Sequence, residues 1–189
     1  LNLSGASNVA LVSFVSGGAV IKNLITEGSV NVTSIYGAGI VARVDTSEEG
    51  NNNEHIYIQN CINRANVSAT GGAKYLAGIV SHYQGKYNRG NCLFIEDCTN
   101  VGSINLSSQG YGAGILTYGT YGATINNCTN RGEINIPGMA GNMAGIAAEL
   151  HNYCTVVNCV NVGNINGGSM NIGGIVGRAE KVNIYNSYN

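Results

Sequence analysis

Short apolar segments recur along the whole chain, and polar segments rich in Asn and Gly separate them. Many of the apolar segments contain Ile and Val, as at residues 40–41 and 79–80. Short β-branched runs that are bounded by Gly and Asn are typical of β-strands. None carries a 3.6-residue apolar stripe long enough for a helix. The pattern therefore predicts an all-β protein.

The apolar segments belong to an internal repeat. The phrase Asn-Cys-Thr-Asn-Arg-Gly-Glu-Ile-Asn at 127–135 recurs closely at 97–105 and 158–166, loosely at 60–68 and 23–31, and in part at 186–189. Its Cys position falls at 24, 61, 98, 128, 159 and 187, so successive copies lie 37, 37, 30, 31 and 28 residues apart. A Gly-Ile-Val type of segment follows each full copy about 16 residues later, and an Ile or Val usually precedes the Cys position by three. Each repeat therefore predicts three short strands.

Three short strands in such a repeat predict one coil of a parallel β-solenoid. Equivalent strands of successive coils would then stack about 4.8 Å apart. As a general rule, parallel crossover connections favour a right-handed coil. We expect an all-β, right-handed parallel β-helix of five to six coils, each of 28–37 residues, that forms a single domain over residues 1–189.

In-register stacking would align equivalent residues into ladders. A stacked Asn amide can donate to the coil on one side and accept from the coil on the other. Three structural ladders are expected, formed by Asn60, Asp97, Asn127 and Asn158, by Cys61, Cys98, Cys128 and Cys159, and by Asn63, Asn100, Asn130 and Asn161. Glycines two residues after the last of these ladders are expected at corners that need a positive φ, namely Gly28, Gly102, Gly132 and Gly163.

The six cysteines divide into two groups. Four share one repeat position, and a ladder of buried thiols is favoured for them because a buried Cys packs as a small hydrophobe. Cys92 and Cys154 lie in longer segments two repeats apart, and would form a disulfide only if those segments lean together. No C-x-x-C pair or close His pair is present, so we expect no metal site.

The N-C-x-N-x-G-x-I phrase followed by G-I-V resembles the GLUG-motif repeat over nearly the whole chain. Such repeats occur in bacterial surface adhesins and as non-catalytic repeats beside the protease domain of IgA-specific metallopeptidases. The H-E-x-x-H motif of those proteases is absent, because the three His are His55, His82 and His151. The resemblance implies a non-catalytic repeat of a secreted or cell-surface protein.

Composition and charge exclude several classes of function. Only 10% of residues are charged and the net charge is −1, which gives no electrostatic attraction to nucleic acid. No apolar stretch is long enough to span a bilayer, so membrane insertion is not expected. The 28 glycines argue against helical bundles, and the 44% hydrophobic content argues against disorder.

Most variation between repeats falls in inserts after each Gly-Ile-Val segment, at 42–57, 81–94, 117–124, 148–155 and 177–183. These inserts are expected to project from one edge of the solenoid, where repeat proteins often bind ligands. The candidate ligand-binding residues on this loop edge are His55, His82, Tyr83, Tyr87, Tyr118, Tyr121, Glu149, His151 and Tyr153. Tyr side chains suit a glycan or protein ligand, although they could also simply cover the coil edge. The acidic run from Asp45 to Glu54 lacks regular Ca²⁺-loop spacing and is interpreted as a solvated loop.

The leading hypothesis is a non-catalytic, extracellular structural or adhesive solenoid, acting as a stalk or filament subunit, that needs no cofactor. The alternative is a carbohydrate-active enzyme, a polysaccharide lyase or glycoside hydrolase, with Glu149, His151, His82 and Tyr118 as its nearest approach to a catalytic group. The sequence begins and ends within a copy of the repeat rather than between copies. Two explanations stay open, namely flanking repeats of the same kind and head-to-tail stacking of subunits.

Overall fold

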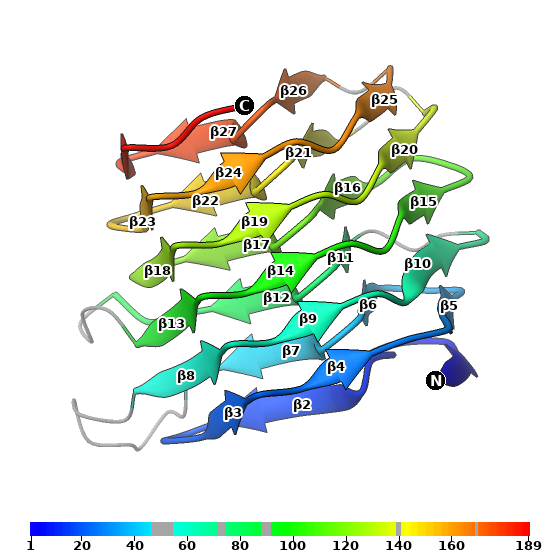
Figure 1. The fold of residues 1–189 in the computed structure, drawn as a ribbon, viewed down its shortest axis with the longest axis horizontal. Coiled ribbons are helices and arrows are strands. Elements are labelled where there is room, and N and C mark those ends of the chain that lie inside the picture. The colour runs from blue at the N-terminus through cyan, green and yellow to red at the C-terminus, as the bar shows by residue number, and fades with distance from the viewer. Residues whose placement is uncertain (47–54, 72–74, 88–91, 139–140, 169) are drawn as a thin grey trace.

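A computed structural model describes the chain except for residues 47–54, 72–74, 88–91, 139–140 and 169. The described part contains 28 short β-strands and no helix, and so no helix that could cross a membrane. The strands form parallel in-register sheets, stacked in about six coils from the N-terminus to the C-terminus (Figure 1). The structure therefore confirms an all-β parallel solenoid.

Five sheets, named A to E in the order in which each coil visits them, run along the solenoid. Sheet A consists of β1 (Asn2–Gly5), β5 (Ser29–Val32), β10 (Asn66–Ala69), β15 (Ile104–Leu106), β20 (Ile134–Ile136) and β25 (Ile165–Gly167). Sheet B consists of β6 (Tyr36–Ala38), β11 (Tyr75–Ala77), β16 (Tyr111–Ala113), β21 (Asn142–Ala144) and β26 (Asn171–Gly173). Sheet C consists of β2 (Val12–Ser16), β7 (Val41–Asp45), β12 (Val80–Gln84), β17 (Leu116–Thr120), β22 (Ala147–His151) and β27 (Val176–Glu180).

The other two sheets complete each coil. Sheet D consists of β3 (Val20–Lys22), β8 (Ile56–Gln59), β13 (Leu93–Glu96), β18 (Ala123–Asn126), β23 (Thr155–Val157) and β28 (Asn183–Tyr185). Sheet E consists of the two-residue strands β4 (Ile25–Thr26), β9 (Ile62–Asn63), β14 (Thr99–Asn100), β19 (Thr129–Asn130) and β24 (Val160–Asn161).

A coil thus contains five short strands, where the sequence pattern predicts three. The difference has two causes. The Gly-Ile-Val segment is a bend, with sheet B ending at Ala38 and sheet C starting at Val41. The residues around the second Asn of the repeat also pair with neighbouring coils as sheet E, whose strands are too short to show an apolar pattern.

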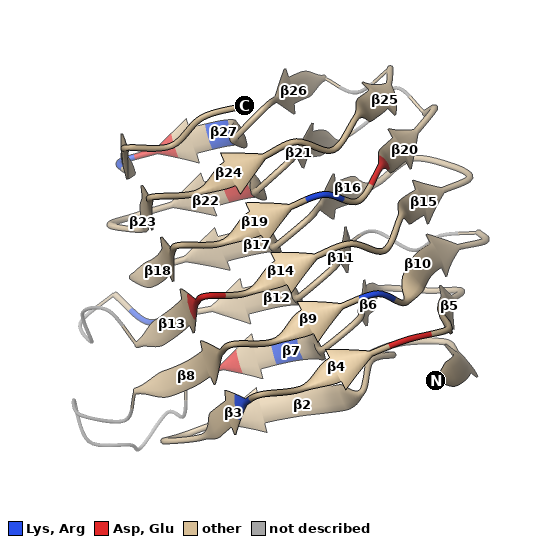
Figure 2. Ribbon diagram, viewed as in Figure 1, with Lys and Arg blue, Asp and Glu red and all other residues tan. Residues whose placement is uncertain are grey.

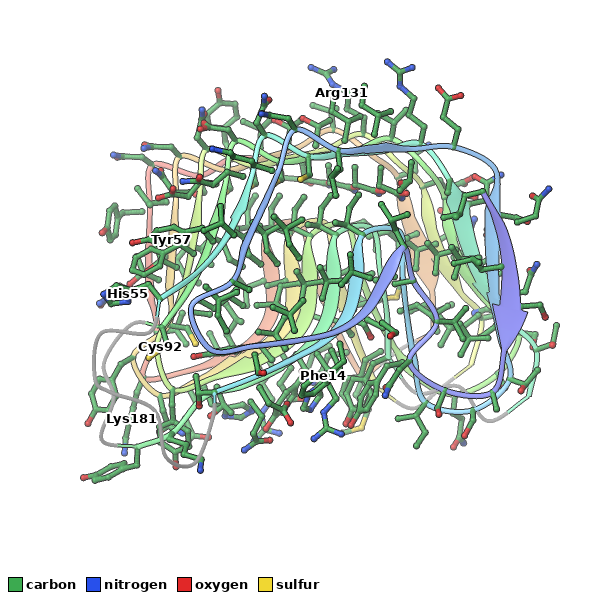
Figure 3. The ribbon with its side chains drawn as sticks, turned by 90° about the horizontal axis from the view of Figure 1, so that it is seen from below. Phe14, His55, Tyr57, Cys92, Arg131 and Lys181 are labelled. Atoms are coloured by element: carbon green, nitrogen blue, oxygen red, sulfur yellow. The ribbon has the colours of Figure 1, made fainter. Side chains whose placement is uncertain are left out.

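The interior contains two main apolar cores and a small cluster of alanines at the bend between sheets B and C. The larger core lies between sheets C and D and contains the Ile column of sheet D, including Ile58, Ile95 and Ile125, together with the Ile residues of the Gly-Ile-Val bends. The smaller core lies between sheets A and B and includes Val67, Ile104 and other fully buried side chains. Figure 3 looks along the stack and shows side chains filling the inside of the coils, while Arg131 projects from the opposite side to Phe14.

A column of buried Asn side chains runs along sheet E. Asn63 Nδ2 donates to Asn100 Oδ1 at 2.8 Å, and Asn100 Nδ2 donates to Asn130 Oδ1 at 2.8 Å. The same step continues through Asn161 to Asn189, and Thr26 Oγ1 donates to Asn63 Oδ1 at the other end. Each Nδ2 in the interior of the column also donates to a backbone carbonyl two residues later, such as Asn100 to Gly102 at 2.9 Å. Every hydrogen bond between the Asn side chains of this column therefore runs from its donor toward the C-terminal coil.

Two sets of glycines make room for this column. A Cβ on Gly78, at the bend between sheets B and C, would overlap the side chain of Asn100 and the carbonyl of Gly114. A Cβ on Gly102 would overlap the carbonyl of Ala65 in the preceding coil. Of the glycines that lie two residues after the Asn column, only Gly28 has the expected positive φ. Close contact with the backbone of the preceding coil explains Gly102, Gly132 and Gly163 instead.

The positive φ lies at the first Asn position of the repeat. Asn60, Asp97, Asn127 and Asn158 all have φ between 51° and 55°. Asn and Asp are the non-glycine residues that tolerate this left-handed conformation best. Their side-chain contacts are partial, as in Asn127 Nδ2 donating to Asp97 Oδ1 at 2.6 Å. Backbone geometry at the corner between sheets D and E therefore explains this column better than a continuous amide ladder.

The cysteines are all buried thiols. Each of the four in register donates its thiol proton to backbone carbonyls, as in Cys98 Sγ to Glu96 O at 3.2 Å. Burial raises the pKa of Cys128 well above its ordinary value. Cys92 and Cys154 flank sheet D in different coils and form no disulfide. The column at the Cys position thus packs as a set of small apolar groups.

We predict that Asn100→Ala destabilises the fold by about 2–4 kcal/mol. The change leaves a cavity and removes the donor to Asn130 Oδ1 and Gly102 O. The measurement is urea unfolding. The matched control is Asn105→Ala on the outer face of sheet A, whose amide donates to Ser103 Oγ and accepts from Asn135. That variant should cost less than about 1 kcal/mol, because water can replace those partners. Equal losses for the two variants would contradict the importance of the buried column.

Candidate functional site

Among the described residues, the first part of each segment that follows a Gly-Ile-Val lies in a strand of sheet C rather than in a loop. Only the part between sheets C and D lies at the turn where these segments were expected to project. His82, Tyr118 and Glu149 lie in β12, β17 and β22, where they stack at one register position of sheet C. Val80 and Tyr83 both face the larger core although they are three residues apart, so strict alternation is interrupted after the bend and His82 faces outward beside Tyr83.

One outward column of sheet C carries most of the polar chemistry of this face. From the first coil to the last it consists of Phe14, Arg43, His82, Tyr118, Glu149 and Arg178. Figure 2 shows the charged positions at its two ends, on β7 and on β22 and β27. No two charges of the same sign are neighbours in this column, which avoids repulsion across the short distance between coils.

A column of tyrosines on sheet B lies beside it. Tyr75 pairs with Tyr36 on one side and Tyr111 on the other, and the Tyr75 and Tyr111 rings stack with centroids 4.9 Å apart. The two columns touch across the bend, since the ring centre of His82 lies 4.6 Å from that of Tyr36 and 5.7 Å from that of Tyr75. We name Tyr36, Tyr75, Tyr111, His82 and Tyr118 the aromatic strip.

Burial sets the protonation of the aromatic strip. Desolvation, followed by the charge of Arg43, lowers the pKa of His82 to about 4. Nδ1 of this imidazole is buried and has no hydrogen-bond partner among the described residues. Desolvation also raises the pKa of Tyr75 to about 12 and raises the pKa of Tyr36 and Tyr118. At neutral pH His82 is therefore uncharged, and the phenols of Tyr36, Tyr75 and Tyr118 are protonated.

A charged cluster lies beyond the strip in the last two coils. Glu149 is buried, and its carboxylate accepts from Asn142 Nδ2 at 2.8 Å and from Arg178 at 3.2 Å. Its Oε1 also lies 2.7 Å from His151 Nε2, and His151 Nδ1 lies 3.3 Å from Glu180. The Glu149 carboxylate thus has three partners, Asn142, Arg178 and His151, and the cluster joins β22 to β21 and β27. The arrangement satisfies a buried charge in the way that structural ion pairs require.

The opposite end of the column is held by an ion pair within one strand. The Arg43 guanidinium binds Asp45 through both a 3.0 Å and a 2.6 Å hydrogen bond. Its Cζ also lies 6.0 Å from the centre of the Phe14 ring and 5.9 Å from that of Tyr36, which is cation–π geometry. The hydrogen bond to Asp45 is the largest cause that raises the pKa of Arg43.

Three other tyrosines meet where sheet C turns into sheet D. Tyr87, Tyr121 and Tyr153, with Lys86 and Gly122, surround a small hollow of about 80 Å³. Tyr87 and Tyr153 are 72% and 59% exposed, and the Tyr87 and Tyr121 rings meet edge to face at 5.9 Å. We name these five residues the tyrosine edge. Figure 3 shows the same side of the solenoid, where Lys181 and Cys92 mark the turn.

The backbone of the tyrosine edge is strained. Tyr121 and Tyr153 have φ of 56° and 66°, in the left-handed region that bulky residues seldom adopt. Asn152 and Lys181 hold the position of Tyr121 in the next two coils, and Gly122 holds the position of Tyr153 in the preceding coil, all with positive φ. The turn therefore requires a left-handed residue, and an Asn would meet that requirement with less strain.

The remaining candidate residues lie elsewhere. His55 packs on the outer face of sheet D, 5.4 Å from the Phe94 ring and 6.1 Å from Tyr57. Tyr83 is fully buried in the larger core, and its hydroxyl donates to Tyr121 O at 3.3 Å. Tyr83 is therefore removed from the candidate ligand-binding residues. Its inward direction follows from alternation, because its neighbour His82 faces outward.

The described residues contain no group of three or more His, Cys, Asp or Glu side chains arranged to hold a metal ion. Of the acidic run, Asp45 binds Arg43. Glu48, Glu49 and Glu54 lie outside the described residues.

Sequence reasoning missed the tyrosines of sheet B and the two arginines of sheet C. The signal for the tyrosines was present, since Tyr36, Tyr75 and Tyr111 each precede the Gly of a Gly-Ile-Val segment by three residues. The arginines became visible only through register, because Arg43 and Arg178 are separated by three whole coils in their column.

We predict that His82 makes the fold sensitive to acid. Its folded pKa of about 4 lies below its unfolded value of about 6.5, so its contribution is complete above pH 6.5. As the pH falls from 6.5 to 4, the unfolded chain binds a proton that the folded chain does not. Stability should then drop, by an amount of the order of 3 kcal/mol over the whole window.

The check is urea unfolding between pH 7 and pH 4 for His82→Phe and the parent chain. His82→Phe keeps a stacked ring and should flatten this part of the pH dependence. Tyr118→Phe keeps His82 and its burial, and should retain the slope. An unchanged slope in His82→Phe would contradict the assignment.

Comparison with known proteins places the chain in no named group: no family model, curated protein or solved structure matches it.

Proposed function

We propose that the chain is a non-catalytic structural or adhesive solenoid that binds glycans through the tyrosine edge. The observation that carries the proposal is the convergence of Tyr87, Tyr121 and Tyr153 around one hollow at the turn between sheets C and D. Exposed aromatic rings offer apolar faces to the C–H groups of a sugar, and their hydroxyls reach its oxygens.

Two features favour the tyrosine edge as a binding surface. The hollow lies on a rigid support, since Gly122 N donates to Asn152 O and Tyr153 N donates to Lys181 O in the following coils. The left-handed Tyr121 and Tyr153 store strain that Asn would relieve. A strained aromatic residue kept in a position suited to Asn is expected where the side chain has a role beyond stability.

The aromatic strip is less suited to this role. Its ring faces cover one another, as in the stacked pairs Tyr75–Tyr111 and His82–Tyr118. A sugar therefore meets ring edges there, rather than faces. His82 is only 8% exposed, which limits contact further.

We place the protein at the cell surface or outside the cell, as a stalk or filament subunit that carries this edge. The support is indirect and comes from the repeat. Stacked coils make a stiff, extended body of nearly constant cross-section, and such bodies hold a binding edge away from a surface. Buried thiols need no disulfide for this role.

The test is binding of the fluorescently labelled chain to a glycan array, followed by titration of the best glycan. Tyr87→Ala should weaken binding at least tenfold, because it removes the most exposed ring of the tyrosine edge. Tyr153→Asn should weaken binding similarly and raise stability by up to about 1 kcal/mol, because it relieves the left-handed Tyr. A purely structural role for Tyr153 predicts no change in binding.

Tyr185→Ala is the matched control, since Tyr185 is 51% exposed on the last strand of sheet D. It should bind as the parent chain does. Absence of binding to every glycan, or equal loss in the control, would contradict the proposal. Shortening of a bound polysaccharide during incubation would instead support the carbohydrate-active alternative, and Glu149→Gln would then test the charged cluster.

A further inference from the structure

Three tyrosines of sheet B lie next to one another in neighbouring coils. Tyr75 in β11 pairs in register with Tyr36 in β6 on one side and with Tyr111 in β16 on the other. The Tyr75 and Tyr111 rings are stacked, with centroids 4.9 Å apart and planes inclined by 15°. We infer that Tyr75 and Tyr111 are a site of oxidative cross-linking, at which a peroxidase and hydrogen peroxide join the two rings as dityrosine.

Neighbouring groups hold the Tyr75 ring in this position. The His82 imidazole and the Tyr118 ring both meet it edge to face, with centroids 5.7 Å and 5.9 Å away. Its backbone is held as well, because β11 pairs with a strand on each side. A ring confined in this way cannot turn aside, so an oxidised Tyr75 stays against Tyr111. The reaction between the two rings is then favoured by proximity and orientation.

The coupling needs only the two phenols and the oxidant. Each phenol gives up one electron and its hydroxyl proton. Hydrogen peroxide, through the peroxidase, takes up both electrons and both protons and becomes water. The two phenoxyl radicals then form one carbon–carbon bond between Cε atoms, which lie next to the hydroxyl groups. The hydrogen on each of these carbons moves to the oxygen of its own ring, so both phenols are restored and the product has two hydrogen atoms fewer.

The stacked pair is better placed for this bond than other tyrosine pairs. Radical density lies in p orbitals perpendicular to the ring, so stacked rings direct these orbitals at each other. Tyr87 meets Tyr121 at 86° and Tyr118 meets Tyr75 at 68°, which directs the orbitals past each other. Tyr36 is inclined to Tyr75 by 32° and lies farther away, at 5.5 Å.

The link would join two coils covalently. In the part of the chain that the structure describes, no disulfide does so, because the cysteines are free thiols. Closing the chain between Tyr75 and Tyr111 restricts its unfolded state, as a disulfide of the same span does. The oxidised chain should therefore unfold at a higher urea concentration than the parent.

The test is oxidation of the dilute chain by a haem peroxidase and a limiting amount of hydrogen peroxide. The monomer is then isolated and digested for mass spectrometry. The most abundant link should join the peptides that contain Tyr75 and Tyr111, with two hydrogen atoms lost. The urea midpoint of this monomer, measured with reductant present to exclude disulfides, should rise. A monomer without this link, or one linked mainly through other tyrosines, would overturn the inference.

Two variants remove the reacting hydroxyls and keep the stacked rings. Tyr75→Phe and Tyr111→Phe should not form the link, and Tyr75→Phe should gain no stability on oxidation. A cooperative urea transition before oxidation shows that each variant is folded. The matched control is Tyr185→Phe, since Tyr185 is 51% exposed on β28. It should cross-link and gain stability as the parent chain does. An equal gain in Tyr75→Phe, or loss of the link in the control, would also overturn the inference.

Discussion

The stacking of one buried amide per coil is the interaction on which the rest of the structure depends. The Asn column lies between the two apolar cores and satisfies polar groups that water cannot reach. An unpaired amide in such a place would be costly. Each Asn is paired only when the next coil is in register, so the column fixes the alignment of every other residue. The bend at Gly78 follows from it, because any side chain there would displace Asn100.

Register in turn decides which surfaces the protein has. A residue type that occurs once per repeat becomes a line along the solenoid, as with the tyrosines of sheet B. A residue that varies between repeats becomes a local feature, as with the charged cluster around Glu149. Neighbouring positions in a column are close enough for like charges to repel strongly. The arginines of sheet C accordingly have aromatic or acidic neighbours in their column.

The repeat was sufficient to predict the solenoid, the buried Asn column and the thiol column, because these depend only on equivalent positions being stacked. It was insufficient for the strand count, since two-residue strands such as Thr99–Asn100 leave no alternation to detect. The direction of each side chain past the bend was also hidden. Tyr83 and His82 are adjacent in sequence, yet one is buried in the core and the other belongs to the outer strip. The left-handed Asn60 position could not be distinguished from an amide ladder, because both favour the same residue.

The described connections also bear on how such a chain changes over generations. Each coil pairs only with the coils on either side, and differences in coil length are accommodated between the same strands. Duplication or loss of one whole coil would leave every column continuous, whereas loss of part of a coil would break all of them at once. A whole coil is thus the unit that can be gained or lost without disrupting this fold. The number of coils can change while the cross-section of the solenoid stays constant.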